Sequence, residues 1–293
     1  MALASFVGAK PGDLVFAPNA TTALNAVIRS LPLEPGDEIL TTAHEYGAIV
    51  RTWEFAGAEL VVCEPEDIPG RIGPRTRAVQ VSHVTSPTAL VCAVHEVCAA
   101  ARQANVLSIV DGAHAPGQLE LDLDSLDADV YSGNCHKWLS APKGAGFLWA
   151  RPEHQEWIEP RVVSWGYRED ADFGERHGWA GTFDPAAYLS VPKAIEVHAT
   201  FDLESMRGLA DDAERRLWEF GLPRVPGQAA PFVRAVELPP GDAQELWKRL
   251  YEEFRIEVPV YEWEGRRLLR ISIGPYNDGE DVDRLIEALR RTL

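Results

Sequence analysis

The chain has 293 residues, of which 46% are hydrophobic, enough to bury a sizeable core in one large domain or two. Its 28 lysine and arginine residues face 45 aspartate and glutamate residues, and the resulting net charge of −17 would repel a nucleic-acid backbone or an anionic membrane. The composition indicates a globular protein and disfavours nucleic acid and membranes as partners.

The N-terminus and the cysteines indicate the expected environment. Residues 1–12 carry no positive charge ahead of their short apolar run, and no apolar run in the chain is long enough to span a bilayer. We therefore expect a cytoplasmic protein. Cys63, Cys92, Cys98 and Cys135 include no CxxC pair and lie mostly in apolar segments, which predicts reduced thiols and disfavours a structural metal.

Short runs rich in β-branched residues alternate with longer amphipathic runs in the first part of the chain. Such alternation is typical of a mostly parallel sheet flanked by helices, so the fold class is α/β. The predicted strands are residues 38–42, 60–63, 78–82, 106–110, 129–132 and 146–149. Apolar residues at helical spacing predict helices at residues 21–31, 46–56 and 94–104.

The pattern changes near residue 190. A helix-rich stretch comes first, and an α+β pattern then predicts strands at residues 232–238 and 267–273 with helices at 242–254 and 278–293. We expect a large domain over residues 1–190 and a small C-terminal α+β domain over 191–293. The stretch 164–182 shows no clear periodicity, and long loops of this kind are often functional.

Asp111 and Lys137 supply the two groups that pyridoxal phosphate (PLP) needs, an acid for the ring nitrogen and an amine for the aldehyde. Asp111 directly follows a predicted strand, where open parallel sheets bind ligands. A helix cap is the plainer interpretation of this aspartate alone. Lys137 stands between a histidine and a tryptophan, before a glycine-rich turn, a setting that a solvated surface lysine does not need. Lys143 is the rival for the same role, although its Pro-Lys-Gly context suggests a turn.

Thr21 and Thr22 follow Asn19 at the start of the first clear helix. Helix N-termini bind phosphate through free backbone amides and the helix dipole, so this segment is a candidate phosphate site. Ordinary capping of the helix explains the same residues equally well. His114 would contact the phenolic oxygen of the cofactor or simply fill a turn.

Several motifs fall in the order found in class V aminotransferases, a family that includes group II cysteine desulfurases. The resemblance covers nearly the whole chain, and the segments 110–117 and 133–138 look most like the isopenicillin N epimerase-like branch. The motifs are residues 19–25, His44-Glu45-Tyr46, Ser82-His83-Val84-Thr85-Ser86, Asp111-Gly112-Ala113-His114, His136-Lys137 and Leu269-Arg270-Ile271-Ser272.

The resemblance implies a fold type I PLP-dependent enzyme, a large cofactor-binding domain with a smaller C-terminal one, usually a homodimer with active sites at the subunit interface. Lys137 would bind the cofactor aldehyde covalently, and Arg270 would bind the carboxylate of an amino-acid substrate. The implied cofactor-binding residues are Thr21, Thr22, Tyr46, Ser86, Asp111, His114, Asn134, His136, Lys137 and Thr182.

Their implied roles differ. Asp111 would pair with the pyridine nitrogen and His114 with the phenolic oxygen, and Tyr46 occupies the place where relatives stack a histidine on the ring. The phosphate would lie among Thr21, Thr22, Asn134 and His136. Thr182 would reach the phosphate of the neighbouring subunit.

The reaction is less determined than the cofactor. A persulfide-forming desulfurase needs a cysteine in the small domain, but residues 257–263 contain none and all four cysteines precede residue 136. An epimerase or racemase needs a second acid on the opposite face of the ring, for which Tyr46, His83 and His177 are candidates. An aminotransferase or a C–S lyase needs only one lysine for its proton transfers.

Relatives carry a substantial segment before the phosphate-binding helix, whereas this sequence starts almost at that helix. An alternative of another class is therefore a truncated PLP-binding protein without turnover. The presence of Lys137, Asp111 and Arg270 together argues against it, because a scaffold has no chemical need for all three.

Overall fold

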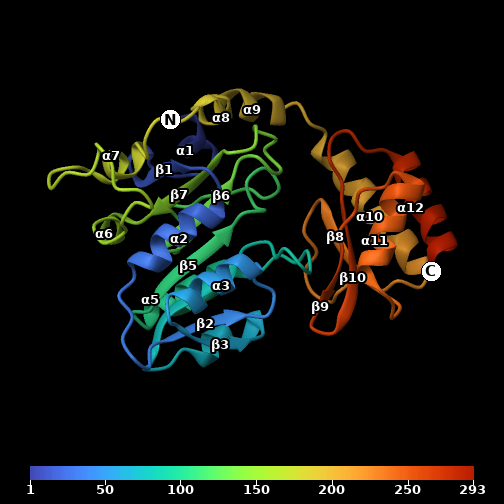
Figure 1. The fold of residues 1–293 in the computed structure, drawn as a ribbon, viewed down its shortest axis with the longest axis horizontal. Coiled ribbons are helices and arrows are strands. Elements are labelled where there is room, and N and C mark those ends of the chain that lie inside the picture. Colours follow the sequence, from blue (N-terminus) through green and yellow to red (C-terminus); the bar gives the residue numbers. More distant parts are fainter. The chain divides into compact units, whose positions relative to one another are not determined.

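The computed structural model describes all residues from 1 to 293 and divides them into two compact units, Met1–Val84 with Cys92–Thr200 and Phe201–Leu293 with Thr85–Val91 (Figure 1). The first unit extends beyond residue 190 because helix α9 (Val191–His198) packs on α1 (Ala2–Phe6). His198 at the end of α9 also bonds the carbonyl of Gly117 through Nε2 at 2.7 Å. These contacts attach α9 to the sheet-containing unit.

The first unit contains one seven-stranded sheet, and its topology confirms the expected α/β class with a mostly parallel sheet (Figure 1). Strands β3, β2, β4, β5 and β6 run parallel to their neighbours, whereas β7 is antiparallel to both β6 and β1. The spatial order is β1 (Leu14–Ala17), β7 (Gly146–Ala150), β6 (Val130–Asn134), β5 (Leu107–Gly112), β4 (Thr76–Ser82), β2 (Glu38–Thr42) and β3 (Glu59–Cys63).

Helices cover both faces of this sheet. Leu24 and Ile28 of α2 (Ala20–Ser30) and Trp53 of α3 (Gly47–Phe55) share a core with Ile109 of β5. Successive strand residues point to opposite faces, so Ser108 lies on the other side, where α5 (Val94–Gln103) packs on β4 and β5. The shorter elements of the unit are η1 (Pro11–Asp13), η2 (Pro65–Asp67), α4 (Ile68–Arg71), α6 (Pro152–Gln155), α7 (Phe173–Gly178) and α8 (Ala186–Leu189).

Helix α7 lies inside the stretch 164–182, which showed no periodicity in the sequence. It is a single short helix fixed by a capping box, in which the Asp172 carboxylate accepts a hydrogen bond from the Glu175 amide at 2.8 Å and Glu175 bonds back to Asp172. The stretch is therefore partly helical.

The second unit is built on a three-stranded antiparallel sheet in the order β8 (Val233–Leu238), β10 (Arg266–Ser272), β9 (Val260–Trp263). Helices α10 (Leu203–Glu219), α11 (Ala243–Phe254) and α12 (Gly279–Thr292) enclose a core with Leu269 and Ile271 of β10. The segment Thr85–Val91 belongs here because Ala89 accepts a hydrogen bond from Ala230 N–H at 2.9 Å and Val91 N–H donates to Gln228 at 2.8 Å.

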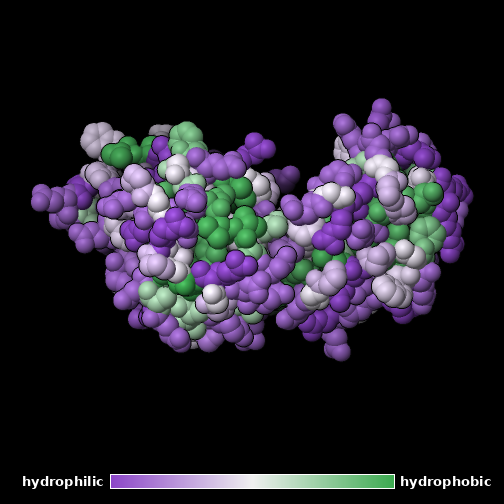
Figure 2. Space-filling view, turned by 90° about the horizontal axis from the view of Figure 1, so that it is seen from below, coloured by the Kyte–Doolittle hydropathy of each residue, from purple (hydrophilic) through white to green (hydrophobic).

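The surfaces of both units are largely hydrophilic on the face shown in Figure 2, with an apolar patch on the first unit. None of the helices combines the length and apolar character that a membrane-spanning segment requires. All four cysteines are free thiols, and only Cys63 is partly exposed.

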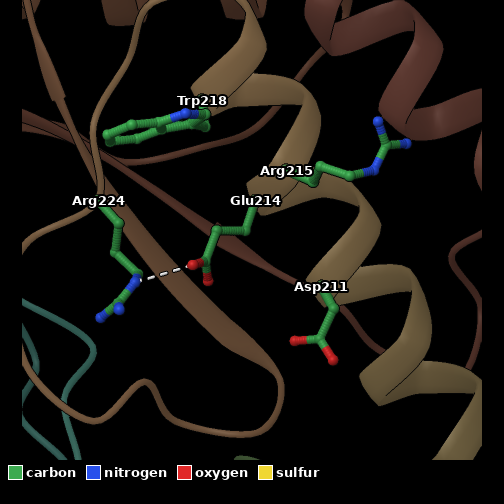
Figure 3. Close-up of a pocket in the computed structure, with 5 residues that line it drawn as sticks. All are labelled: Asp211, Glu214, Arg215, Trp218 and Arg224. Atoms are coloured by element: carbon green, nitrogen blue, oxygen red, sulfur yellow. Dashed lines mark ion pairs between the residues drawn. The ribbon is translucent and has the colours of Figure 1, made fainter.

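Two arginines of the second unit form ion pairs with acids of α10. Figure 3 shows Glu214 of α10 reaching toward Arg224, whose Nε lies 2.8 Å from the carboxylate. The buried side chain of Arg234 on β8 pairs with the same glutamate, at 2.5 Å from Nε, and with Asp211. These pairs link α10 to β8 and to the chain before it.

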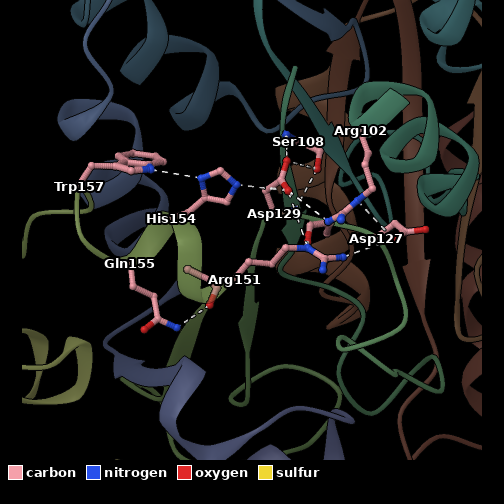
Figure 4. A network of polar contacts seen from close by, with 10 residues as sticks. Arg102, Ser108, Asp127, Asp129, Arg151, His154, Gln155 and Trp157 are labelled. Atoms are coloured by element: carbon pink, nitrogen blue, oxygen red, sulfur yellow. Dashed lines mark hydrogen bonds and ion pairs between the residues drawn. The ribbon is translucent and has the colours of Figure 1, made fainter. Parts of the chain in front are cut away.

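A second polar network lies at the amino end of β5 and β6 in the first unit. Asp129 accepts hydrogen bonds from the Ser108 amide at 2.8 Å and the Ser108 hydroxyl at 3.0 Å, while His154 Nε2 lies 3.4 Å from its other oxygen (Figure 4). Arg102 and Arg151 approach the same carboxylate. The network closes the end of the sheet opposite to the one that carries Asp111.

Candidate active site

The candidate site lies along the carboxyl edge of the parallel strands. The register pairs Ser82 at the end of β4 with Asp111 near the end of β5, and Asp111 with Ser132 of β6. Because the carboxyl ends of parallel strands share one edge, the residues that follow these strands converge there. This edge positions Tyr46, Asp111 and Lys137.

Lys137 is exposed on the turn that follows β6. The turn is fixed on both sides of the lysine, since Cys135 N–H donates to Ala145 at 2.9 Å and Ala141 N–H donates to Cys135 at 2.9 Å. Lys143, the rival lysine, is exposed on the next turn, before β7. The amine of Lys137 therefore extends from a rigid support.

Asp111 is 4% exposed. Burial raises the pKa of its carboxyl group, and a hydrogen bond from Ala113 N–H at 2.9 Å and the positive charge of Lys137 oppose this rise. No other donor of the chain hydrogen-bonds to this carboxylate. A buried acid with unused acceptor capacity fits a protonated pyridine nitrogen.

His114 follows Asp111 on the same turn and is half-buried. Its Nδ1 accepts a hydrogen bond from Trp138 Nε1 at 3.3 Å, which leaves Nε2 as the protonated nitrogen of the neutral ring. Trp138 is the neighbour of Lys137, so this contact links the two turns of the site. A ring held in this way can donate from Nε2 to an oxygen.

The N-terminus of α2 forms an anion site beside them. Asn134 Oδ1 accepts a hydrogen bond from Ala20 N–H at 2.8 Å, and Asn19 Oδ1 accepts from the amide and the hydroxyl of Thr22 at 2.8 and 3.0 Å. The amide and hydroxyl of Thr21 make no hydrogen bond within the chain. With the helix dipole they offer the donors that a phosphate needs.

Glycine at position 146 allows this arrangement. A Cβ there would lie 2.9 Å from Asn19 Cα and 3.1 Å from Asn134 Oδ1, so any other residue would push the helix N-terminus away from β6 and β7. His136 is fixed beside it through Nδ1, which bonds the carbonyl of Ala145 at 2.7 Å. Burial lowers the pKa of His136, and the bond to Ala145 opposes that change.

Tyr46 precedes α3 and is 47% exposed at the carboxyl end of β2. Its neighbour Glu45 is buried and received no role from the sequence. Thr42 and Ser82 hydroxyls donate to Glu45 at 2.7 Å each, and the Ser82 amide and Gln80 Nε2 donate at 3.1 and 3.0 Å. An acid in the turn just beyond a buried strand, three residues after Thr42, is the signal in the sequence that could have identified Glu45.

His83 and His177 occupy very different places. His83 Nδ1 lies 2.8 Å from the Tyr131 hydroxyl, and burial lowers the pKa of His83 to about 4. His177 on α7 bonds the carbonyl of Ile158 at 3.1 Å and packs on Phe173. His177 lines the same pocket as Thr22 of α2, and its ring is engaged by Ile158 and Phe173.

Arg270 and Ser86 meet in the second unit. Arg270 Nη1 donates to the carbonyl and the hydroxyl of Ser86 at 2.5 and 3.0 Å. Arg270 Nε is buried without an acceptor, and Nη2 makes no hydrogen bond within the chain. Ser86 thus binds Arg270 in the structure, whereas the sequence resemblance implies that it binds the cofactor. Thr182 is exposed between α7 and α8, and its contact with a neighbouring subunit stays a prediction.

An α/β unit that carries a lysine, a buried aspartate and a helix N-terminus on one edge of its sheet defines a PLP-dependent enzyme of fold type I. The model of the family described as aminotransferase class-V matches residues 1–285, and the chain belongs to this family.

The chain is 37% identical to an isopenicillin N epimerase of Streptomyces clavuligerus and 39% identical to that of Amycolatopsis lactamdurans. Both alignments cover 98% of this chain and 82% of the relative. A solved structure of a C-DES lysine mutant with glycine covalently linked to the PLP cofactor superposes with a TM-score of 0.82. It shares 25% identity, over 98% of this chain and 83% of that one. The chain is a PLP-dependent enzyme that acts on amino acids.

Proposed function

We propose that the protein removes the Cα proton of an amino-acid substrate in the manner of isopenicillin N epimerase, as an epimerase or racemase or as an aminotransferase. The support comes from two isopenicillin N epimerases that are 37% and 39% identical over nearly the whole chain. An epimerase inverts a carbon centre, and Cα deprotonation is the first step that such an inversion needs.

The positions of the cysteines argue against persulfide chemistry. The second unit, which holds Arg270, contains no cysteine at all. Burial raises the pKa of Cys92, Cys98 and Cys135 to about 12, and the thiol form is a poor nucleophile. Burial also raises the pKa of the partly exposed Cys63, which lies at the end of β3. We therefore propose that the chain is not a persulfide-forming desulfurase.

PLP, when bound, supplies an electron-withdrawing ring that accepts the electrons left at Cα. Lys137 would hold the cofactor and then carry the proton, because its turn presents the amine from a rigid backbone. Asp111 would keep the ring nitrogen protonated, and the α2 N-terminus with Thr21 would bind the phosphate. Asn134 and His136 hold the shape of that phosphate site.

Arg270 would bind the substrate carboxylate through the Nε and Nη2 edge of its guanidinium. Ser86 occupies only Nη1, so this edge remains for a bidentate contact with two carboxylate oxygens. Ser86 would then be a positioning residue for Arg270.

Inversion at Cα requires an acid on the face of the ring opposite Lys137. Tyr46 supports this role best, because it is half-exposed beside the carboxyl edge. His83 is neutral at pH 7 and bonded to Tyr131, and His177 is bonded to Ile158 and packs on Phe173. We assign the second proton to Tyr46.

We also propose a cytoplasmic homodimer. A largely apolar pocket of about 470 Å³ opens on the first unit between β1, α2 and α7, with Phe16 and Phe183 among its lining residues. Trp165 nearby in the sequence is 88% exposed, an unusual state for a large apolar side chain. Light scattering on the purified protein tests the dimer, and a monomer mass would contradict it.

The reaction is tested by incubating the holoenzyme with a panel of single-enantiomer amino acids in deuterated water. Deuterium at Cα together with loss of chirality supports epimerisation, and a lasting pyridoxamine absorption band supports transamination. Pyruvate released from cysteine derivatives would indicate a lyase instead, and persulfide on the protein would contradict the proposal. Absence of exchange with every substrate would favour a binding protein without turnover.

A further inference from the structure

Glu45 is a buried acid that the proposed reaction does not use. Its two carboxylate oxygens receive four hydrogen bonds, two on each oxygen, and all four donors are neutral groups of β2 and β4. No lysine or arginine pairs with it. A buried carboxylate without a counterion is costly to ionise, because burial removes the water that stabilises its charge.

The donors around Glu45 suit both protonation states. The Ser82 amide and the Gln80 side-chain amide can only donate to it from their nitrogens. The hydroxyls of Thr42 and Ser82, at 2.7 Å each, can reverse their roles and accept a proton from the carboxyl group. Burial accordingly raises the pKa of Glu45 to about 7, against the lowering effect of the Ser82 and Thr42 hydrogen bonds.

Ser82 connects Glu45 to the cofactor site. It contacts Glu45 through both its amide and its hydroxyl, and it is the register partner of Asp111 on the neighbouring strand. The charge of Asp111 accordingly contributes to the raised pKa of Glu45. Two buried carboxyl groups therefore flank Ser82 of β4, Glu45 in the turn after β2 and Asp111 in β5.

The other titratable groups near the pair leave it acidic overall. Burial keeps the Cys92 thiol, the Tyr131 hydroxyl and the His83 ring neutral at pH 7. On the turn of Glu45, His44 is paired with the exposed Glu64 at 3.5 Å. The positive charge of Lys137 lowers the pKa of Asp111.

We propose that Glu45 and Asp111 form a coupled acid pair, in which Glu45 holds a proton in the apoprotein and releases it when a cationic ring nitrogen binds at Asp111. The cation neutralises the charge of Asp111, which removes the repulsion that disfavours ionised Glu45. The released proton passes to solvent, because the ring nitrogen that binds is already protonated. Glu45 is thus a positioning residue that acts through Asp111, and the inference rests on the proposed role of Asp111.

Calorimetric titration of the apoprotein with pyridoxine 5′-phosphate tests this without turnover, because that probe has the ring nitrogen and phosphate but no aldehyde. Comparing heats in two buffers of different ionisation enthalpy counts the protons exchanged. The wild type should release about half a proton more than Glu45→Gln at pH 7, and the difference should vanish near pH 9, where Glu45 is ionised before binding. Glu64→Gln, which removes an exposed carboxylate paired with the neighbouring His44, should match the wild type.

Equal proton counts for the wild type and Glu45→Gln would overturn the proposal. If Glu45→Gln does not fold, Ser82→Ala tests the same point, because loss of the hydroxyl bonded to Glu45 should move the pH of largest release upward. An unchanged pH of largest release contradicts the proposal. Asp111→Asn separates the two claims: if it alters the count while Glu45→Gln does not, only the Glu45 claim fails, and if neither does, the role of Asp111 fails.

Discussion

Asp111 lies near the end of β5 and Lys137 follows the neighbouring parallel strand β6, and the positive charge of the lysine opposes the rise that burial causes in the pKa of the aspartate. One residue is exposed and the other is buried at the same edge of the sheet. The lysine thus offsets part of the cost that burial imposes on an ionised Asp111, a contribution that a protonated cofactor nitrogen would take over.

Asp111→Asn should weaken catalysis without unfolding the protein. Asparagine can still accept the hydrogen bond from Ala113, but it cannot hold the pyridine nitrogen protonated. We expect kcat to fall by at least about 100-fold, as on removal of one electrostatic contact in an active site. Steady-state kinetics check this, with thermal melting as the control for folding. An unchanged kcat would show that another group protonates the ring.

Arg270→Lys should raise KM for the amino acid by roughly 10- to 100-fold, because an ammonium group loses the bidentate contact. Arg266→Lys on the same strand is the matched control, since Arg266 stacks over Trp263 at 4.6 Å and should leave KM unchanged. Initial rates over a range of substrate concentrations measure both variants. Equal KM values in the wild type and Arg270→Lys would remove the arginine from substrate binding.

Tyr46→Phe should separate the two proton transfers. The variant keeps Lys137, so one enantiomer should still exchange its Cα proton with deuterated water while inversion falls by roughly 10²- to 10⁴-fold. Chiral chromatography and proton NMR on the same sample measure the two rates. Tyr276→Phe, at a tyrosine that is 85% exposed in the second unit, is the control. Retained inversion in Tyr46→Phe would assign the second acid elsewhere.

Asp129→Asn should lower stability in a pH-dependent way. Burial would raise the pKa of Asp129, but hydrogen bonds from His154 and Ser108 together lower it. An acid whose pKa is lowered in the folded state stabilises the fold at pH values above its unfolded pKa of about 3.9. This stability is lost as the pH falls through the lower pKa of the folded state.

Urea unfolding at pH 7 should therefore show Asp129→Asn destabilised by about 2 kcal/mol, with a gap that narrows below about pH 4. Asp127→Asn is the control, because Asp127 is more exposed and forms surface pairs with Arg102 and Arg151. A gap that stays constant with pH would contradict the assignment of the effect to the charge of Asp129.

The sequence was sufficient for the α/β class and for the strands β5 and β6 that position Asp111 and Lys137, because buried parallel strands form continuous apolar runs. Strand β1 is only four residues long and gave no such signal. The engagement of Ser86 by Arg270 and the burial of Glu45 depend on contacts between residues far apart in the chain. Periodicity contains no information about such packing, whereas the Asp172 and Glu175 spacing of a capping box is a sequence signal for the start of α7.

Borohydride reduction of the holoenzyme, followed by peptide mass spectrometry, tests the central claim most directly. The aldehyde of the cofactor would become fixed to the amine that holds it, and the label should appear on the peptide that contains Lys137. Lys137→Ala should lose the label and the absorption band, while Lys143→Ala should keep both. A label on Lys143, or a reducible band that survives in Lys137→Ala, would contradict the account.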